Sequence, residues 1–152
     1  NTNHPKIENW IPFLRKLITN PDEETYLIGH SVGCQAILRF LESINKKIGG
    51  IILVAPWIKL NEQTIKEEGE ESIEIAKPCV ETPIDFKKVK KNIKKSIALF
   101  SDNDPFVPLE NKNRFEKELE TKCIIEKNKG HFSEADNIKE LPRVLKELME
   151  MI

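Results

Sequence analysis

The sequence predicts a single α/β domain, residues 1–152, in which helices flank a mostly parallel β-sheet. Short apolar, β-branched runs alternate along the chain with longer segments whose apolar residues recur at helical spacing. Each apolar run is also bounded by turn-forming or charged residues, which is typical of strands that are buried on both faces. The four predicted strands are Thr25 to Ile28, Gly50 to Ala55, Ser96 to Phe100 and Lys122 to Glu126.

Two helices are predicted around the first strand. The first covers the apolar residues from Ile7 to Ile18, with Pro12 in its first turn or at a bend, and ends before Asn20-Pro21. The second runs through Ala36 to Ile44. Its predicted last turn is basic, at Lys46 and Lys47, and Gly49-Gly50 is its stop.

Two more helices follow the later strands. One is predicted from about Pro108 to Glu120 and the other from about Ile138 to Met149. The last helix closes the domain with one apolar face, predicted to consist of Ile138, Leu141, Leu145, Leu148 and Met149.

The stretch from Pro56 to Pro83 fits no strand or long helix, because it is rich in glutamate and interrupted by Gly69, Pro78 and Pro83. We interpret it as an excursion over the sheet, where it either shapes a binding cleft or forms a solvated surface loop. The basic run Lys87 to Lys95 has no interleaved aromatic residues that would stack on bases. It therefore indicates a solvated helix face and not a nucleic-acid site.

Composition excludes several classes of protein. The 24 basic and 25 acidic residues nearly cancel, so no global field attracts nucleic acid or an anionic membrane. Apolar runs stop far short of the roughly 20 residues that a membrane span requires. Three cysteines without a CxxC pair argue against a disulfide framework or zinc site and favour a reducing compartment, the cytoplasm.

The sequence Gly29-His30-Ser31-Val32-Gly33 lies between a predicted strand and a predicted helix. This Gly-x-Ser-x-Gly pattern is typical of a nucleophile elbow, in which the strand reverses sharply into the helix and holds the serine in a strained backbone. Glycines are expected on both sides because the turn leaves no room for neighbouring side chains. Ser31 is therefore the candidate nucleophile.

A serine nucleophile needs a histidine and a carboxylate, which follow it in this order along such chains: serine, acid, histidine. His131 is the one histidine after Ser31, in a loop beyond the fourth strand. Asp102 and Asp104 both lie in the loop after the third strand, and spacing alone leaves both open. Taken singly, each of these residues is also ordinary loop chemistry, but together they favour catalysis.

The expected roles follow from this arrangement. His131 takes the proton of Ser31 as general base, the aspartate orients the imidazole, and the Val32 N–H serves as an oxyanion donor. Trp57, Phe106 and Phe132 follow strand ends and are candidates for an acyl pocket, although core packing explains them equally well. His30 is expected to pack or to hydrogen-bond. This chemistry requires no cofactor and no metal.

The chain resembles the small serine hydrolases of the α/β-hydrolase superfamily, the family that includes retinoblastoma-binding protein 9. The similar segments are Gly29 to Gly33, Ser101-Asp102-Asn103-Asp104-Pro105 with the following Phe106-Val107-Pro108, and Gly130-His131-Phe132. In that family the triad aspartate directly precedes proline, so the resemblance selects Asp104. It implies a three-layer α/β-hydrolase-like sandwich and hydrolysis of a small-molecule ester or acyl substrate through an acyl-enzyme, without naming a protein partner.

Members of that family begin with a further strand, a glycine-rich loop that supplies a second oxyanion donor, a helix and a second strand. Nothing before Asn1 in this sequence corresponds to them, and without them the strand leading to Ser31 has an unpaired outer edge. We therefore expect Asn1 to Ile152 to be the C-terminal part of a protein about 35 residues longer, which is about the size of one βαβ unit.

The competing class is a non-catalytic module on the same fold, whose cleft binds a protein or a ligand. Fold alone does not separate this class from an esterase.

Overall fold

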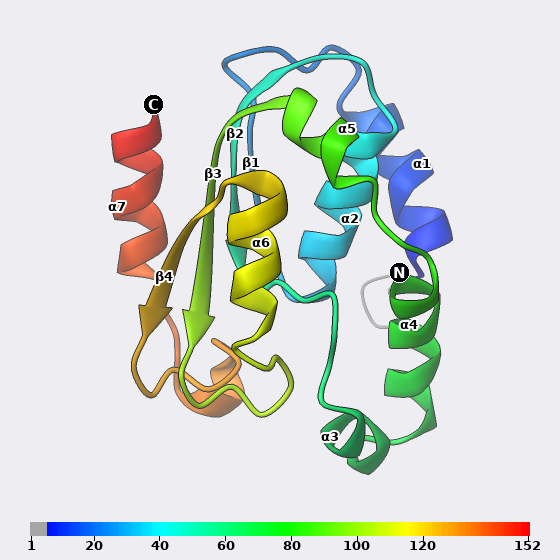
Figure 1. The fold of residues 1–152 in the computed structure, drawn as a ribbon, viewed down its shortest axis with the longest axis vertical. Coiled ribbons are helices and arrows are strands. Elements are labelled where there is room, and N and C mark those ends of the chain that lie inside the picture. The colour runs from blue at the N-terminus through cyan, green and yellow to red at the C-terminus, as the bar shows by residue number, and fades with distance from the viewer. Residues whose placement is uncertain (1–5) are drawn as a thin grey trace.

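The computed structural model describes residues 6–152 and contains one parallel sheet of four strands in the order β1-β2-β3-β4. The strands are β1 (Tyr26–His30), β2 (Ile48–Val54), β3 (Ile93–Ser101) and β4 (Lys122–Glu126). Parallel pairing brings all four carboxyl ends to one edge of the sheet, at the bottom of Figure 1. The predicted α/β class is confirmed.

Helices lie on both faces of this sheet, which gives three layers (Figure 1). One face is covered by α2 (Val32–Glu42), α5 (Phe86–Lys91) and α6 (Asn111–Leu119), with α1 (Ile7–Leu17) packed outside α2. The other face carries α7 (Pro142–Met151), which contacts β2. The hydrophobic core lies between these layers, and every residue of β2 is buried, as expected of an inner parallel strand.

The predicted strands agree with the observed ones to within a few residues, but the interpretation of Gly49-Gly50 as a helix stop is wrong. Helix α2 ends at Glu42, and both glycines lie inside β2. A Cβ at residue 49 would lie 2.6 Å from the Tyr26 ring, and one at residue 50 would lie 2.3 Å from the sulfur of Met151. These glycines therefore permit close packing on the two faces of the strand.

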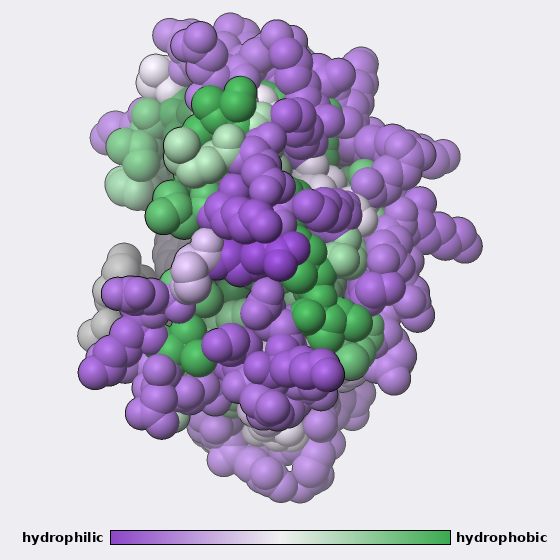
Figure 2. Space-filling view, turned by 90° about the vertical axis from the view of Figure 1, so that its left-hand side faces the viewer, coloured by the Kyte–Doolittle hydropathy of each residue, from purple (hydrophilic) through white to green (hydrophobic). Residues whose placement is uncertain are grey.

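The last helix also differs from the prediction. It begins at Pro142 and not at Ile138, and it buries Val144, Glu147 and Met151. Leu145 and Met149, which were predicted to face the core, are 61% and 67% exposed. Figure 2 faces the side on which α7 lies in Figure 1 and shows apolar surface between hydrophilic patches there. A buried glutamate changes which helix face is inside, and apolar periodicity does not detect this.

The excursion after β2 is helical, contrary to the prediction that it contains no long helix. It forms α3 (Glu62–Glu67) and the twelve-residue α4 (Glu70–Glu81), separated by Gly69 in a left-handed conformation with φ 100°. Pro78 lies inside α4, which continues to Glu81. The buried guanidinium of Arg39 on α2 donates to the carbonyls of Cys79 and Thr82 at 2.9 and 2.6 Å, which ties the end of α4 to α2.

Within residues 6–152, no helix is long and apolar enough to cross a membrane.

Candidate active site

Ser31 occupies the turn between the end of β1 and the start of α2, with φ 49° and ψ −116°. Few non-glycine residues adopt a positive φ, and such a conformation costs about 1–3 kcal/mol, which the surrounding structure must offset. The Ser31 N–H donates to the Val54 carbonyl at 2.9 Å and so extends the sheet into the turn. The predicted nucleophile elbow therefore has the strained geometry expected of it.

The two glycines of the elbow differ in what they permit. A Cβ at residue 29 would lie 2.7 Å from the Cδ1 of Ile37 and 2.9 Å from the backbone of Gly33, so the turn requires glycine there. At Gly33 nothing lies within 4 Å of an added Cβ, so the expectation that this glycine also relieves crowding is wrong in this structure.

Val32, directly after the serine, is the first residue of α2. Amides in the first turn of a helix have no intrahelical acceptor and lie at the positive end of the helix dipole. The Val32 N–H is thus available to an anion that forms next to Ser31.

Asp104 and His131 come together at the carboxyl ends of β3 and β4. His131 Nδ1 lies 2.9 Å from Asp104 Oδ2 and 3.1 Å from Oδ1, and the two side chains are 15% and 1% exposed. Asp104 Oδ1 also accepts the backbone N–H groups of Phe106 and Val107. Asp102, the other candidate acid, instead accepts the N–H of Asn128 at 2.8 Å and does not contact the imidazole.

His30, directly before the candidate nucleophile, contacts the histidine loop. Its Nε2 lies 2.7 Å from the His131 carbonyl oxygen, and the two imidazole rings are 4.9 Å apart between centroids. Desolvation by the surrounding atoms lowers the pKa of His30, although part of its surface remains exposed. Nε2 donates to the carbonyl, so the expected hydrogen-bonding role of His30 is confirmed.

A cavity of about 250 Å³ opens beside Ser31 and His131. Of the three candidate pocket residues, Trp57 and Phe106 line it, whereas Phe132 is buried in the hydrophobic core. The sequence left open whether the excursion shapes a cleft and named none of its lining residues beyond Trp57. Its helices and the loop before them supply Leu60, Ile65, Glu68, Ser72, Ile75 and Ala76. Apolar residues at helical spacing between Ile65 and Ala76 are the signal that could have found them.

Ser31 and His131 line the same cavity. Among residues 6–152, no hydrogen bond joins the Ser31 hydroxyl to the His131 ring. In enzymes that use a serine and a histidine, this hydrogen bond is often long until a substrate is present.

In the described residues, the cysteines and the potential metal ligands form no cluster comparable to that of Asp104 and His131. Cys34 is fully buried and donates to the carbonyls of Gly29 and Val54, and burial raises the pKa of its thiol far above the ordinary range. Burial likewise raises the pKa of Cys123, to about 11. No group of three or more histidine, cysteine, aspartate or glutamate side chains between residues 6 and 152 is placed to hold a metal ion.

Comparison with known proteins gives a consistent picture. A family model described as serine hydrolase matches residues 1–150. The hydrolase YdeN of Bacillus subtilis strain 168 is 29% identical over 146 residues, which cover 95% of this chain and 72% of YdeN. Serine hydrolase RBBP9 of Rattus norvegicus is 29% identical over 140 residues, which cover 92% of this chain and 69% of RBBP9.

Solved structures have the same fold. The crystal structure of the ydeN gene product superposes with a TM-score of 0.85 at 27% identity and covers 97% of this chain and 76% of that one. A structure from work on carboxylesterases of the thaumarchaeon Nitrososphaera gargenis has a TM-score of 0.72 at 15% identity and covers 97% of this chain and 72% of that one. At that identity the second likeness shows the fold alone.

Proposed function

Because this chain belongs to the serine hydrolase family, we propose that it hydrolyses carboxylic esters through an acyl-enzyme formed on Ser31. His131 is the general base and Asp104 is the carboxylate that orients it. The observation that best supports this assignment is the buried Asp104–His131 pair, with a separation of 2.9 Å, beside a cavity that also contains Ser31.

The proton path follows from the two ring nitrogens of His131. Asp104 accepts from Nδ1–H, which leaves Nε2 as the unprotonated nitrogen that receives the Ser31 proton. As the Ser31 oxygen attacks the ester carbonyl, the imidazole becomes cationic and the buried carboxylate stabilises it. His131 then returns the proton to the leaving alcohol, and water repeats the sequence to release the acid.

The negative charge that develops on the carbonyl oxygen forms next to the first turn of α2. The Val32 N–H donates there, and the dipole of the eleven-residue helix adds to its effect. One such donor contributes about 10²–10³-fold to turnover in comparable enzymes.

The lining of the cavity supports an apolar acyl group as substrate. Trp57, Leu60, Ile65, Phe106 and Ala76 present carbon surface beside the nucleophile. Burying the hydrocarbon part of a substrate there is favourable by about 25 cal/mol per Å² of apolar surface. An ester with an apolar acyl group therefore fits this lining, to which Glu68 adds one carboxylate.

Labelling with a fluorophosphonate probe tests this proposal. We expect the wild type to label and to hydrolyse p-nitrophenyl butyrate, and Ser31→Ala to lose labelling and at least about 10³-fold in kcat. Ser96→Ala, a serine at the opposite end of the sheet, is the matched control and should behave as wild type. A wild type that neither labels nor turns over the ester would contradict the proposal and favour a non-catalytic binding module.

A further inference from the structure

The loop that carries His131 has a strained backbone, with three residues at positive φ. Asn128, Gly130 and Phe132 alternate in the left-handed region, with φ of 54°, 53° and 55°. Two of these three residues are not glycine, so side chains outside the loop backbone must hold it in place.

Four consecutive backbone N–H groups of this loop donate to side chains, and these hydrogen bonds hold the strained backbone in place. Three of the acceptors are Ser101, at the end of β3, and the two residues that follow it, and the fourth is Asp136, five residues after His131. In order, the bonds are Asn128 N–H to Asp102 (2.8 Å), Lys129 N–H to Ser101 (3.0 Å), Gly130 N–H to Asn103 (2.8 Å) and His131 N–H to Asp136 (2.9 Å).

Asp136 makes the most concentrated of these contacts. Its Oδ2 accepts the N–H of His131, the N–H of Ser133 at 3.1 Å and the Ser133 hydroxyl at 2.6 Å. Its Oδ1 lies where a Cβ on residue 130 would be, at 1.9 Å, so Gly130 is required by this carboxylate as well as by its own φ. The carboxylate is thus fitted closely under the backbone of the histidine loop.

Asp136 is also ionised when the site operates. The hydrogen bonds from Ser133 and the His131 N–H, together with the charge of His131, hold its pKa below the ordinary value. Its negative charge also acts on His30. The other titratable groups around the His131 imidazole are Asp104 at Nδ1, His30 against the ring and Glu68 on the lining of the cavity.

We propose that Asp136 is a positioning residue for His131. It holds the main chain of the base through the His131 N–H, whereas Asp104 contacts the ring at Nδ1. This inference rests on the proposed function, in which His131 is the base. Asp104 fixes the tautomer, and Asp136 fixes the backbone that carries the ring.

The test compares Asp136→Asn with Asp102→Asn. Both substitutions replace a carboxylate that accepts backbone N–H groups of this loop, one at Asp102 and two at Asp136, and both leave an amide oxygen that can still accept. Only Asp136 has a charge that acts on His131 and His30. We therefore expect the NMR chemical shifts of the His131 ring, measured in the Ser31→Ala protein at neutral pH, to change in Asp136→Asn. Asp102→Asn should leave these ring signals unchanged.

In the active protein, Asp136→Asn should lower kcat by about tenfold with little change in KM, because a displaced base slows proton transfer without altering the cavity that binds the ester. His131 ring signals that do not change, or that change equally in Asp102→Asn, overturn the inference. Since these NMR signals report the surroundings of the ring and not turnover, an inactive wild type would overturn the esterase proposal without affecting this measurement.

If Asp136→Asn does not fold, the effect of His131 on Asp136 is measured instead, because the interaction between the two charges is mutual. The Asp136 carboxyl is titrated by ¹³C NMR in the wild type and in His131→Gln. The pKa of Asp136 should rise when the neighbouring imidazolium is removed. An unchanged Asp136 titration overturns the inference.

Discussion

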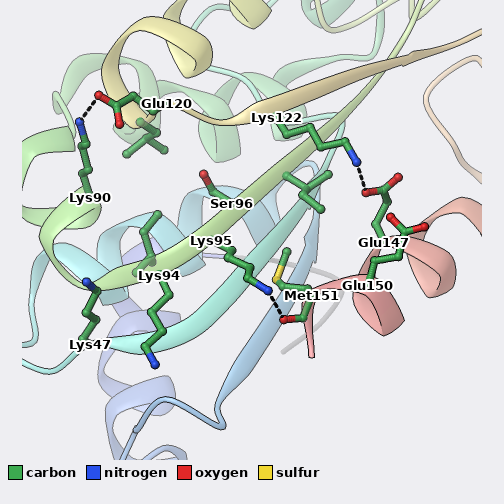
Figure 3. Close-up of a pocket in the computed structure, with 13 residues that line it drawn as sticks. Lys47, Lys90, Lys94, Lys95, Ser96, Glu120, Lys122, Glu147, Glu150 and Met151 are labelled. Carbon is green, nitrogen blue, oxygen red and sulfur yellow. Dashed lines mark hydrogen bonds and ion pairs between the residues drawn. The ribbon is translucent and has the colours of Figure 1, made fainter.

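The two ends of the parallel sheet both gather charged side chains, but they arrange them differently. At the amino ends, five lysines and three glutamates surround a groove, and they pair off in different directions: Lys90 with Glu120, Lys122 with Glu147, and Lys95 with the Met151 carbonyl (Figure 3). Lys94 pairs with Glu23, outside the groove lining. At the carboxyl ends, buried Asp104 and half-buried Asp136 both act on the single residue His131.

The two ends differ in what their buried carboxylates contact: Glu147 pairs with Lys122 and Arg143, whereas Asp104 contacts the imidazole of His131. Exposed ion pairs are screened by water and typically contribute about 0–1 kcal/mol each. A carboxylate that is 1% exposed and directed at one imidazole acts in a medium of lower dielectric constant, where the same charge has a larger effect.

The largest effect should come from Asp104→Asn. This change leaves the shape of the site but removes the acceptor for Nδ1–H, which allows the wrong imidazole tautomer, and kcat should fall by about 10⁴-fold. Initial rates on p-nitrophenyl butyrate measure the loss. Asp102→Asn on the same loop is the control, and an equal loss in both variants would show that the convergence on His131 is not what matters.

Glu147→Gln should have the largest effect at the amino ends, because Glu147 is the one charged group in that groove that is 1% exposed. The loss of its bonds to Lys122 and Arg143 should lower the free energy of unfolding by about 1–3 kcal/mol at pH 7 without changing activity. Urea denaturation measures this.

The same variant has a defined pH dependence. Lys122, foremost, and Arg143 lower the pKa of Glu147 in the folded protein. The stabilisation is therefore complete above the unfolded value of about 4.3 and is lost as pH falls through the lower folded value. The difference between wild type and Glu147→Gln should shrink in acid, and a difference that grows there would contradict the assignment.

Ile65→Ala tests the cavity at the carboxyl ends. Ile65, Leu60 and Ala76 line both this cavity and an adjoining one of about 300 Å³ on the excursion helices. Shortening Ile65 should join the two spaces and raise kcat/KM for an octanoyl ester relative to an acetyl ester by about tenfold, or about 1.4 kcal/mol. Lys66 lines the adjoining cavity but not the one beside Ser31, so Lys66→Ala should leave the ratio of kcat/KM for the two esters unchanged.

The smallest effect should come from Lys90→Ala. The Lys90 and Glu120 side chains are 44% and 73% exposed, so the free energy of unfolding should change by about 0.5 kcal/mol or less. Retention of the wild type on a heparin column should be weak, since the amino-end lysines are largely paired. Strong, salt-dependent retention that Lys90→Ala reduces would instead indicate a nucleic-acid site at this end.

Patterns of a few neighbouring residues correctly predicted the strands and the turn at Ser31. The strand that contains Lys122 was placed within its observed bounds, and Gly29 to Gly33 predicted the strained turn at Ser31. The patterns failed at Glu147 and Gly50, because the burial of a glutamate and the need for a glycine both depend on a neighbour far away in sequence. The helix α4 was missed because glutamates and prolines obscure its apolar face.

The sequence by itself determined the class of fold and predicted the turn at Ser31, because both depend on residues that are close together in the chain. The positions of the motifs give the order of serine, acid and histidine, and the family resemblance selects Asp104. The tertiary structure shows that Asp104 contacts His131 and that Asp102 binds Asn128, because these contacts depend on how two loops pack. The same holds for Asp136 and His30, whose partners come from the packing of one loop against another. Hydrophobic periodicity indicates where the helices and strands lie along the chain, whereas the packing of distant segments decides which face of α7 is buried and which hydrogen bonds form between loops.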